Sequence, residues 1–391
     1  FRSKILSFRD DVDEDRMPSY IKALHEKGII VISYYPLIFC KPLVPLHPEW
    51  LMHFLYDDRP FIENEGWFCL NSPFRDWVSD YLIEWLDNLD LDGFYFDDTN
   101  IGSHQGGREY PGCCCEVCTK LLRDETGLKM PREVDFGSID FRRWLRWRYE
   151  KTKEATKYIL GRIREAHPDC ILEFNYYTRP DTSWVRGHPI DLFGFEEIPA
   201  YAFTEMSRSS RDTGYVSKIN RGKGTFHSLL RHGQQSMPGV TAGLTVYPER
   251  WIFTQHILGA IANGGSAFSN YTSPYLQDDM IRFGFAEAKK RREYIAGETV
   301  KYAAVHYSTQ NRDFRPAEFY KNIGKDGGYT LRDVYGLYDM LGRSHILMDF
   351  LHDKQLADDT LSQYPILLLS NSVCLSDAQV DNIRQYVEQG G

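Results

Sequence analysis

The sequence predicts an α/β protein: a (β/α)8 barrel whose first two strands precede the chain, followed by part of a second α/β unit. Apolar runs recur with helix-like segments between them, the alternation that builds a parallel sheet. Several runs end in polar side chains, as barrel strands do at the mouth that carries the chemistry. In residues 91–100, Leu-Asp-Gly-Phe-Tyr-Phe-Asp-Asp-Thr-Asn, a buried run stops at two carboxylates.

The expected elements follow from periodicity and from breaker residues. Helical spacing over 15–27 ends at Gly28 and precedes an apolar strand. The expected strands are 29–36, the run around Phe94, 170–177, 191–197, 224–230 and 265–271. The expected helices between them include 15–27, 77–86, 139–167 and 251–262. An open doubly wound sheet has the same rhythm, but polar residues at the ends of four strands favour a closed barrel.

The pattern changes after the charged segment 287–293. Two apolar strands, 302–308 and 364–370, then alternate with helix-like segments at 335–341 and 376–388. These elements predict a smaller α/β unit. The expected domains are therefore an N-terminally incomplete barrel over 1–298 and a C-terminally incomplete unit over 299–391.

Composition limits the classes of function. The chain has 391 residues, 42% of them hydrophobic and 14% aromatic, which is enough for a large core. A net charge of -9 argues against a nucleic-acid surface, and no apolar run approaches the roughly 20 residues of a membrane span. Aromatic residues beside carboxylates suit a carbohydrate substrate. Four of eight cysteines lie within 113–118, which favours a reducing, cytoplasmic setting with a metal over a disulfide framework.

The segment Cys113-Cys114-Cys115-Glu116-Val117-Cys118 contains a C-x-C-x-x-C spacing. Cys113, Cys115 and Cys118 can reach one tetrahedral ion, and Cys69 can supply the fourth ligand. A local cluster that uses Cys114 instead, or simply free buried thiols, are the alternatives. Ligation by cysteine alone leaves no open position for a water, so the predicted zinc is structural rather than catalytic.

Glycoside cleavage needs a carboxylate that attacks the anomeric carbon and an acid that protonates the leaving oxygen. Asp97 and Asp98 end the expected fourth strand, and Glu196 and Glu197 end the expected sixth. Alternate barrel strands send side chains into the same layer, whereas neighbours along a strand point to opposite sides. We expect Asp97 to be the nucleophile and Glu197 the general acid and base. Other polar residues at strand ends are expected to bind substrate: Tyr34, Asn175, Tyr177, Arg179 and His227.

Segment 69–73, the strand that ends near residue 98 and the C-x-C-x-x-C after it resemble glycoside hydrolase family 42 β-galactosidases. That resemblance implies a zinc site made from one upstream cysteine and the cluster. Segments 335–338, 364–370 and 386–391 are similar to the flavodoxin-like trimerisation domain that follows the family 42 barrel. This second resemblance implies a homotrimer.

The chain departs from family 42 at both catalytic positions. Residues 97–100 read Asp-Asp-Thr-Asn where that family has Asn-Glu, and 225–228 read Thr-Phe-His-Ser where it has a glutamate nucleophile. Segments 92–97 and 47–50 look more like the hypothetical glycosyl hydrolases and the family 29 α-L-fucosidases, in which an aspartate that closes the fourth strand is the nucleophile. The expected function is a retaining glycoside hydrolase. The alternative is a carbohydrate-binding or assembly protein without a working carboxylate pair. A zinc hydrolase would need His or carboxylate ligands, and none shows a suitable spacing.

Overall fold

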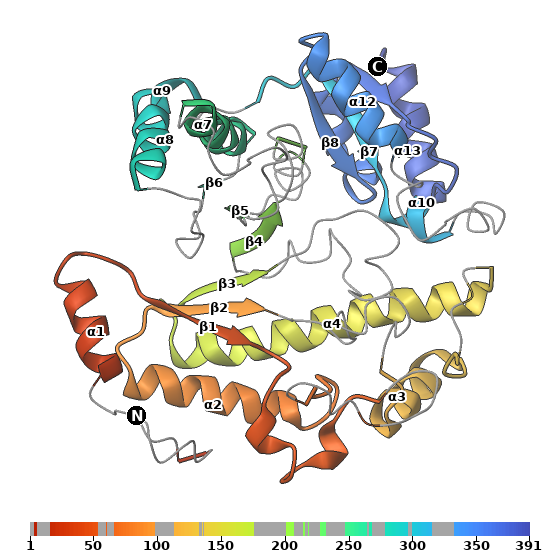
Figure 1. The fold of residues 1–391 in the computed structure, drawn as a ribbon. Helices are drawn as coiled ribbons and strands as arrows, with labels where there is room; N and C mark the ends of the chain where they lie inside the picture. The colour runs from red at the N-terminus through yellow and green to blue at the C-terminus, as the bar shows by residue number, and fades with distance from the viewer. Residues whose placement is uncertain are drawn as a thin grey trace. The chain divides into compact units, whose positions relative to one another are not determined.

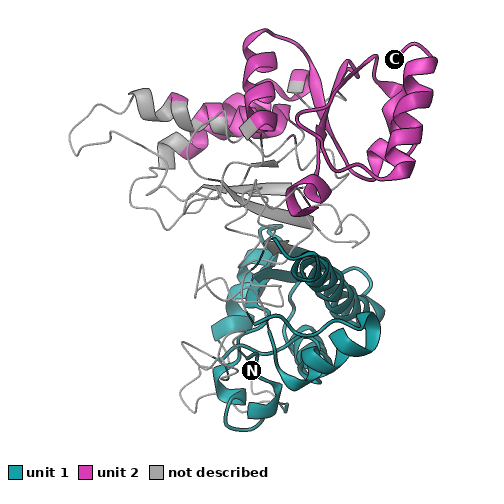
Figure 2. Ribbon diagram, turned by 90° about the vertical axis from the view of Figure 1, so that its right-hand side faces the viewer, with its two compact units in different colours: residues 1–175, 182–200, 320–325 teal, residues 176–181, 201–319, 326–391 magenta. Residues whose placement is uncertain are grey.

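A computed structural model describes the chain apart from a set of terminal and loop segments. The segments not described are 1–3, 6–15, 54–59, 61–65, 98–112, 133–134, 136, 176–200, 207–213, 216–217, 219–226, 232–246, 264–265, 268–277, 296–298 and 315–331. The chain divides into two compact units (Figure 2). Unit 1 comprises 1–175, 182–200 and 320–325, and unit 2 comprises 176–181, 201–319 and 326–391. The domain boundary predicted at 299 lies inside unit 2 and remains a prediction.

Unit 1 contains three neighbouring parallel strands of a sheet, in the order β1-β2-β3. Its strands are β1 (Ile32–Pro36), β2 (Gly93–Asp97) and β3 (Ile171–Asn175). Its helices are α1 (Arg16–His25), α2 (Phe74–Asn88), α3 (Glu116–Thr126) and α4 (Ile139–Ala166), with short 3-10 turns at Lys41–Leu43 and Pro48–Trp50. The long helices α2 and α4 lie side by side against one face of this sheet (Figure 1).

The face of this sheet that meets the helices is apolar. Phe94, Phe96 and Leu172 are no more than 1% exposed, and the Phe94 ring lies 6.3 Å from that of Trp85 on α2. The strands approach closely at Gly93, where an added Cβ would lie 1.8 Å from the carbonyl oxygen of Ile171. Only glycine allows the two backbones to pair in this register.

Unit 2 contains two sets of three parallel strands. One has the order β4-β5-β6, formed by β4 (Tyr201–Met206), β5 (His227–Arg231) and β6 (Ser266–Ala267). The same unit contains the helices α7 (Tyr247–Ala262), α8 (Asp278–Lys290) and α9 (Arg292–Ile295). The other sheet has the order β8-β7-β9, formed by β7 (Ala303–Tyr307), β8 (Met348–His352) and β9 (Ile366–Leu368).

Helices cover both faces of the β8-β7-β9 sheet. They are α12 (Arg332–Arg343) on one face and α13 (Asp377–Glu388) on the other. Unit 2 also contains α10 (Thr309–Phe314) and 3-10 turns at Gln355–Ala357 and Asp359–Gln363. Ala304 and Leu351 join Tyr386 of α13 in one apolar cluster. Side chains alternate along β8, so Phe350 points to the face opposite Leu351. The ring of Phe350 lies 6.2 Å from the ring of Tyr338 on α12.

The prediction of an α/β protein with parallel sheets is confirmed. Most predicted helices and strands occur within a few residues of their expected bounds. The predicted strand 29–36 starts later, because Ile29 and Ile30 are 45% and 63% exposed and β1 begins at Ile32. The predicted strand 191–197 lies outside the described residues. The strand that pairs with β5 is β4, at Tyr201–Met206, and no strand was predicted there from the sequence.

Candidate functional site

The carboxyl end of β2 carries Asp97, the predicted nucleophile, as the last residue of the strand. The Oη atom of Tyr34 on β1 donates a hydrogen bond to Oδ2 of Asp97 at 3.1 Å. The strands pair Pro36 with Asp97 and Tyr34 with Tyr95, so this hydrogen bond runs diagonally between them. Tyr34 is 54% exposed, which leaves the site open to a ligand. The structure thus brings together two of the residues predicted from the sequence.

An aromatic pair lies on the same face of the sheet as Asp97. The Tyr34 and Tyr95 ring centroids are 5.7 Å apart, and the ring planes meet at 44°. Side chains alternate along β2, so Tyr95 and Asp97 point away from the helix-facing Phe94 and Phe96. Aromatic rings beside a carboxylate offer an apolar surface and a charge to the same ligand, an arrangement suited to sugar rings.

Glu173 is a second carboxylate on this face, and it was not predicted from the sequence as a site residue. It lies on β3 opposite Tyr95 and is half-buried. Strands about 4.8 Å apart that rise about 3.3 Å per residue place the Cα atoms of Glu173 and Asp97 about 8 Å apart. The signal in the sequence was a charged residue inside the apolar run Ile-Leu-Glu-Phe-Asn. Such a residue must face something other than the packed helices.

The structure describes only some of the other predicted site residues. Asp98, Tyr177, Arg179, Glu196 and Glu197 lie outside the described residues. Asn175 is the last residue of β3, and its side chain is not described.

His227 is the first residue of β5, and its predicted role in substrate binding stays a prediction. Arg231 holds the carboxyl end of that strand. The apolar run did not show where the strand begins.

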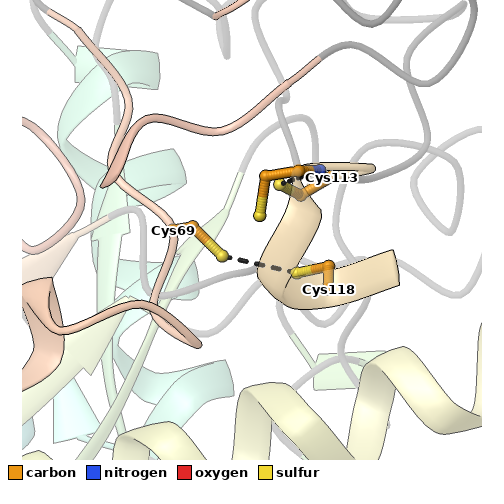
Figure 3. Close-up of side chains that lie close together, drawn as sticks. Cys69, Cys113 and Cys118 are labelled. Atoms are coloured by element: carbon orange, nitrogen blue, oxygen red, sulfur yellow. Dashed lines mark hydrogen bonds between the residues drawn. The ribbon is translucent and has the colours of Figure 1, made fainter. Parts of the chain in front are cut away.

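A second candidate site is a cluster of four cysteines in unit 1. The Sγ atoms of Cys69, Cys113, Cys115 and Cys118 all lie within 4.8 Å of one another, and every one of these residues is buried. Cys69 precedes α2, Cys115 caps α3 and Cys118 lies within α3. The sulfurs of Cys69 and Cys118 are 3.4 Å apart. Figure 3 shows these two side chains pointing toward each other.

The geometry of the cluster suits a metal. Four sulfurs at about 2.3 Å from a tetrahedral zinc ion lie about 3.8 Å from one another. The separation of 3.4 Å between Cys69 and Cys118 is far longer than the about 2.05 Å of a disulfide. The arrangement uses Cys69 rather than Cys114, whose sulfur instead accepts a hydrogen bond from Nη1 of Arg132 at 3.3 Å. These four residues can therefore hold a metal ion.

Neutral hydrogen-bond donors contact two sulfurs of the cluster, those of Cys113 and Cys118. The backbone N–H groups of His53 and Cys115 each donate to Sγ of Cys113 at 3.4 Å. Nδ2 of Asn71 donates to Sγ of Cys118 at 3.3 Å. Such donors stabilise negative charge on sulfur and orient the ligands around a metal.

The sulfurs also change one another's acidity. Hydrogen bonds with Cys113, Cys115 and Cys118 raise the pKa of the Cys69 thiol, and burial raises the pKa of Cys113. The pKa of Cys115 is lowered because Cys113, Cys118 and Cys69 donate hydrogen bonds to its thiolate. Binding of a metal ion by all four sulfurs would release the protons that remain on these thiols.

Comparisons with known proteins bear on the fold. No protein-family model and no curated sequence matches the chain. Among solved structures, the chain is similar to α-L-fucosidase isoenzyme 2 from Paenibacillus thiaminolyticus, with a TM-score of 0.67 and 19% identity over 100% of this chain and 55% of that chain. A catalytic mutant of Gan42B, a GH42 β-galactosidase from G. stearothermophilus, gives a TM-score of 0.71 and 14% identity over 96% of this chain and 63% of that chain.

A third similar structure is the GH42 exo-carrageenase from Bacteroides ovatus. It gives a TM-score of 0.70 and 13% identity over 99% of this chain and 60% of that chain. The chain thus spans 55% to 63% of the length of these three proteins. Together they show that it has a glycoside hydrolase fold. Among the helices in the described part of the chain, none is both long and apolar enough to cross a membrane.

Proposed function

We propose that the protein is a glycoside hydrolase that cleaves its substrate by a two-carboxylate, retaining mechanism. The observation that carries this proposal is the hydrogen bond from Tyr34 to Asp97 at the carboxyl end of β2, beside the ring of Tyr95. Ligands of parallel α/β proteins bind at the carboxyl ends of the strands. The likeness in fold to glycoside hydrolases supports the same assignment.

In the proposed reaction, the carboxylate of Asp97 attacks the anomeric carbon while the bond to the leaving oxygen breaks. Glu197 gives its proton to that oxygen. A water then attacks the anomeric carbon, returns a proton to Glu197 and releases the Asp97 carboxylate. The phenol of Tyr34 orients Asp97 and stabilises its negative charge before the attack.

The metal site belongs to the same proposal. Cys69, Cys113, Cys115 and Cys118 would hold a structural zinc ion, because four soft, buried sulfur donors are the ligand set of closed zinc sites. Its chemistry would be limited to crosslinking the segments before α2 and at the start of α3. The reaction itself would use carboxylates alone.

The architecture proposed for the whole chain is a (β/α)8 barrel over 1–298 and a flavodoxin-like, trimerisation-type unit over 299–391. Two sets of three parallel strands support the first, and the β8-β7-β9 sheet with helices on both faces supports the second. We infer a homotrimer from the likeness of this second unit to trimerisation domains. Light scattering at micromolar concentration tests it, and a clean monomer would contradict it.

A panel of nitrophenyl glycosides of both anomers tests the proposed activity. The wild-type protein should hydrolyse at least one of them, and Asp97→Asn should lower that rate about a thousandfold without unfolding the protein. Hydrolysis that survives in Asp97→Asn would move the nucleophile to Asp98 or refute the site. Binding of a sugar without turnover by the wild type would favour a carbohydrate-binding protein.

A further inference from the structure

Unit 2 carries polar side chains at the carboxyl edge of the β8-β7-β9 sheet. β7 comes first of these strands in the chain, and β8 and β9 pair with it on opposite sides. The strand order therefore reverses at β7. In open parallel α/β sheets, ligands bind outside the carboxyl ends of the strands at such a reversal. A site in unit 2 is therefore expected at this edge, next to the end of β7.

His306, on β7, connects the segments that follow the two neighbouring strands. Its side chain is fully buried. Its Nε2 atom lies 3.2 Å from Oδ1 of Asp353, just after β8, and its Nδ1 atom lies 2.8 Å from Oγ of Ser372, after β9. Ser372 is half-buried, and its neighbours Asn371 and Val373 are exposed. A hydroxyl, an imidazole and a carboxylate are thus in consecutive contact, with the hydroxyl in a loop that reaches the surface.

Asp353 decides which nitrogen of His306 carries the proton. The Asp353 carboxylate also accepts hydrogen bonds from Oγ of Ser308 and from the backbone N–H of Gln310. Burial alone would raise the pKa of Asp353, but hydrogen bonds from His306, Gln310 and Ser308 hold the pKa below its ordinary value. A carboxylate only accepts hydrogen bonds, so Nε2 of His306 donates to it. In the neutral imidazole, Nδ1 then accepts the hydrogen bond of the Ser372 hydroxyl.

The loop that carries Ser372 is held in one conformation. Asn371 has a left-handed φ of 53°, and its carbonyl accepts a hydrogen bond from Nδ2 of Asn311 at 3.0 Å. Oδ1 of Asn311 accepts from the backbone N–H groups of Val373 and Cys374 at 2.9 and 3.2 Å. The backbone N–H of Ser372 donates to no residue in the described part of the chain, so an oxygen of a ligand can accept from it. A hydroxyl held in this way against an oriented imidazole has the arrangement of an activated nucleophile.

We propose that Ser372, His306 and Asp353 form a second catalytic site, which hydrolyses a short-chain carboxylic ester. Oγ of Ser372 attacks the carbonyl carbon, and its proton passes to Nδ1 of His306 while Nε2–H stays bonded to Asp353. Nδ1 then gives this proton to the leaving oxygen, which departs as an alcohol and leaves the acyl group on Oγ. Water attacks the acyl group and gives one proton to Nδ1, and the acid leaves as that proton returns to Oγ.

A short acyl group fits this site because Ser372 is partly covered and its hydroxyl faces a fully buried ring. The activity is independent of the proposed glycosidase site, since Tyr34 and Asp97 lie in unit 1.

Two measurements on the full chain test the proposal. A fluorophosphonate probe should label the wild type, and peptide mass spectrometry should place the label on Ser372. Hydrolysis of p-nitrophenyl acetate, corrected for the rate in buffer, should fall about a hundredfold or more in Ser372→Ala and in Asp353→Asn. Ser362→Ala is the matched control and should keep the wild-type rate, because the Ser362 hydroxyl donates to the backbone carbonyl of Asp359.

Three results would overturn the inference. The first is wild-type protein that takes no label, or takes it only at other residues. The second is Ser372→Ala that hydrolyses the ester as fast as the wild type. The third is folded Asp353→Asn at the wild-type rate, which would show that the three side chains only fix the loops. If Asp353→Asn does not fold, the label and the surface-loop variant Ser372→Ala still decide. The glycoside assays use other substrates, so either activity can fail without the other.

Discussion

The phenol of Tyr34 donates a hydrogen bond to the carboxylate of Asp97 at 3.1 Å, from one strand to its neighbour. The parallel pairing of β1 and β2 sets the distance between the two side chains. A carboxylate that accepts such a bond is oriented before a substrate arrives, and preorganised groups of this kind lower the barrier of a reaction.

Tyr34→Phe should therefore lower the rate of glycoside hydrolysis about 10- to 100-fold, because a hydrogen bond to a charged group contributes about 1.5–3 kcal/mol. Steady-state kinetics on the best nitrophenyl glycoside measure it. Tyr158→Phe is the control. It removes a similar hydrogen bond, which Tyr158 on α4 donates to Oδ1 of Asp76 on α2 at 2.5 Å. An equal loss in both variants would assign the effect to general damage.

Glu173 and Glu197 compete for the role of the second carboxylate, and leaving-group dependence separates them. The variant that lacks the general acid should lose about a hundredfold or more on substrates with poor leaving groups. It should lose little in the first step on dinitrophenyl glycosides, which need no protonation. We expect this pattern for Glu197→Gln and a smaller, uniform loss for Glu173→Gln. The reverse pattern would transfer the role to Glu173.

The purified protein should contain about one equivalent of zinc per chain, held by the four-cysteine cluster. Cys115→Ser should lose the metal, whereas Cys114→Ser should keep it, because the Cys114 sulfur faces Arg132. At free zinc a thousandfold above the dissociation constant, binding stabilises the folded state by about 4 kcal/mol. Elemental analysis and thermal unfolding with and without a chelator measure both effects. Full zinc in Cys115→Ser would contradict the ligand set.

Asp349 should make unit 2 sensitive to acid. Burial alone would raise the pKa of this carboxyl, but Lys218 and Lys301, with hydrogen bonds from Thr299 and Tyr364, hold the pKa below its ordinary value. A lowered pKa stabilises the fold in full above the unfolded value of about 3.9, and this stability is lost as pH falls through the folded-state pKa. Urea unfolding between pH 3 and pH 7 should therefore show a smaller loss of stability on acidification in Asp349→Asn than in the wild type.

At neutral pH, Asp349→Asn should cost about 1–3 kcal/mol, because it leaves lysine charge without its partner in a mostly buried place. Asp381→Asn is the matched control. The exposed pair of Asp381 with Arg384 should contribute less than about 1 kcal/mol. Equal costs in the two variants would show that the Asp349 network contributes no more than a surface pair.

Elements with local signals were predictable from the sequence. The helix predicted over 139–167 is α4, whose cap Ser138 accepts a hydrogen bond from the backbone N–H of Phe141. The helix predicted over 376–388 is α13, which begins with a capping box formed by Ser376 and Gln379. Both signals lie within a few residues of the helix they start.

Features that depend on distant residues were not predictable. The strand β8 was missed because its run Met-Asp-Phe-Leu-His contains a charge at Asp349. That charge is matched by Lys301, 48 residues away, and the carboxylate also accepts a hydrogen bond from Tyr364, 15 residues away. Glu173 was missed for a related reason, since the pairing of β3 with β2 decides that it shares a face with Asp97. Spacing of cysteines is itself a long-range signal, which is why Cys69 could be joined to 113–118.

The cysteine cluster joins chain on both sides of α2 and β2, so an ion bound there would close a loop that contains the strand of Asp97. Crosslinks of this kind disfavour the unfolded chain by limiting its conformations. The supply of zinc to a growing cell would then decide how much of the synthesised protein carries a well-formed β2. Cells grown without zinc would then yield protein that contains the proposed catalytic carboxylates but has low activity. Adding zinc to that protein would restore the activity.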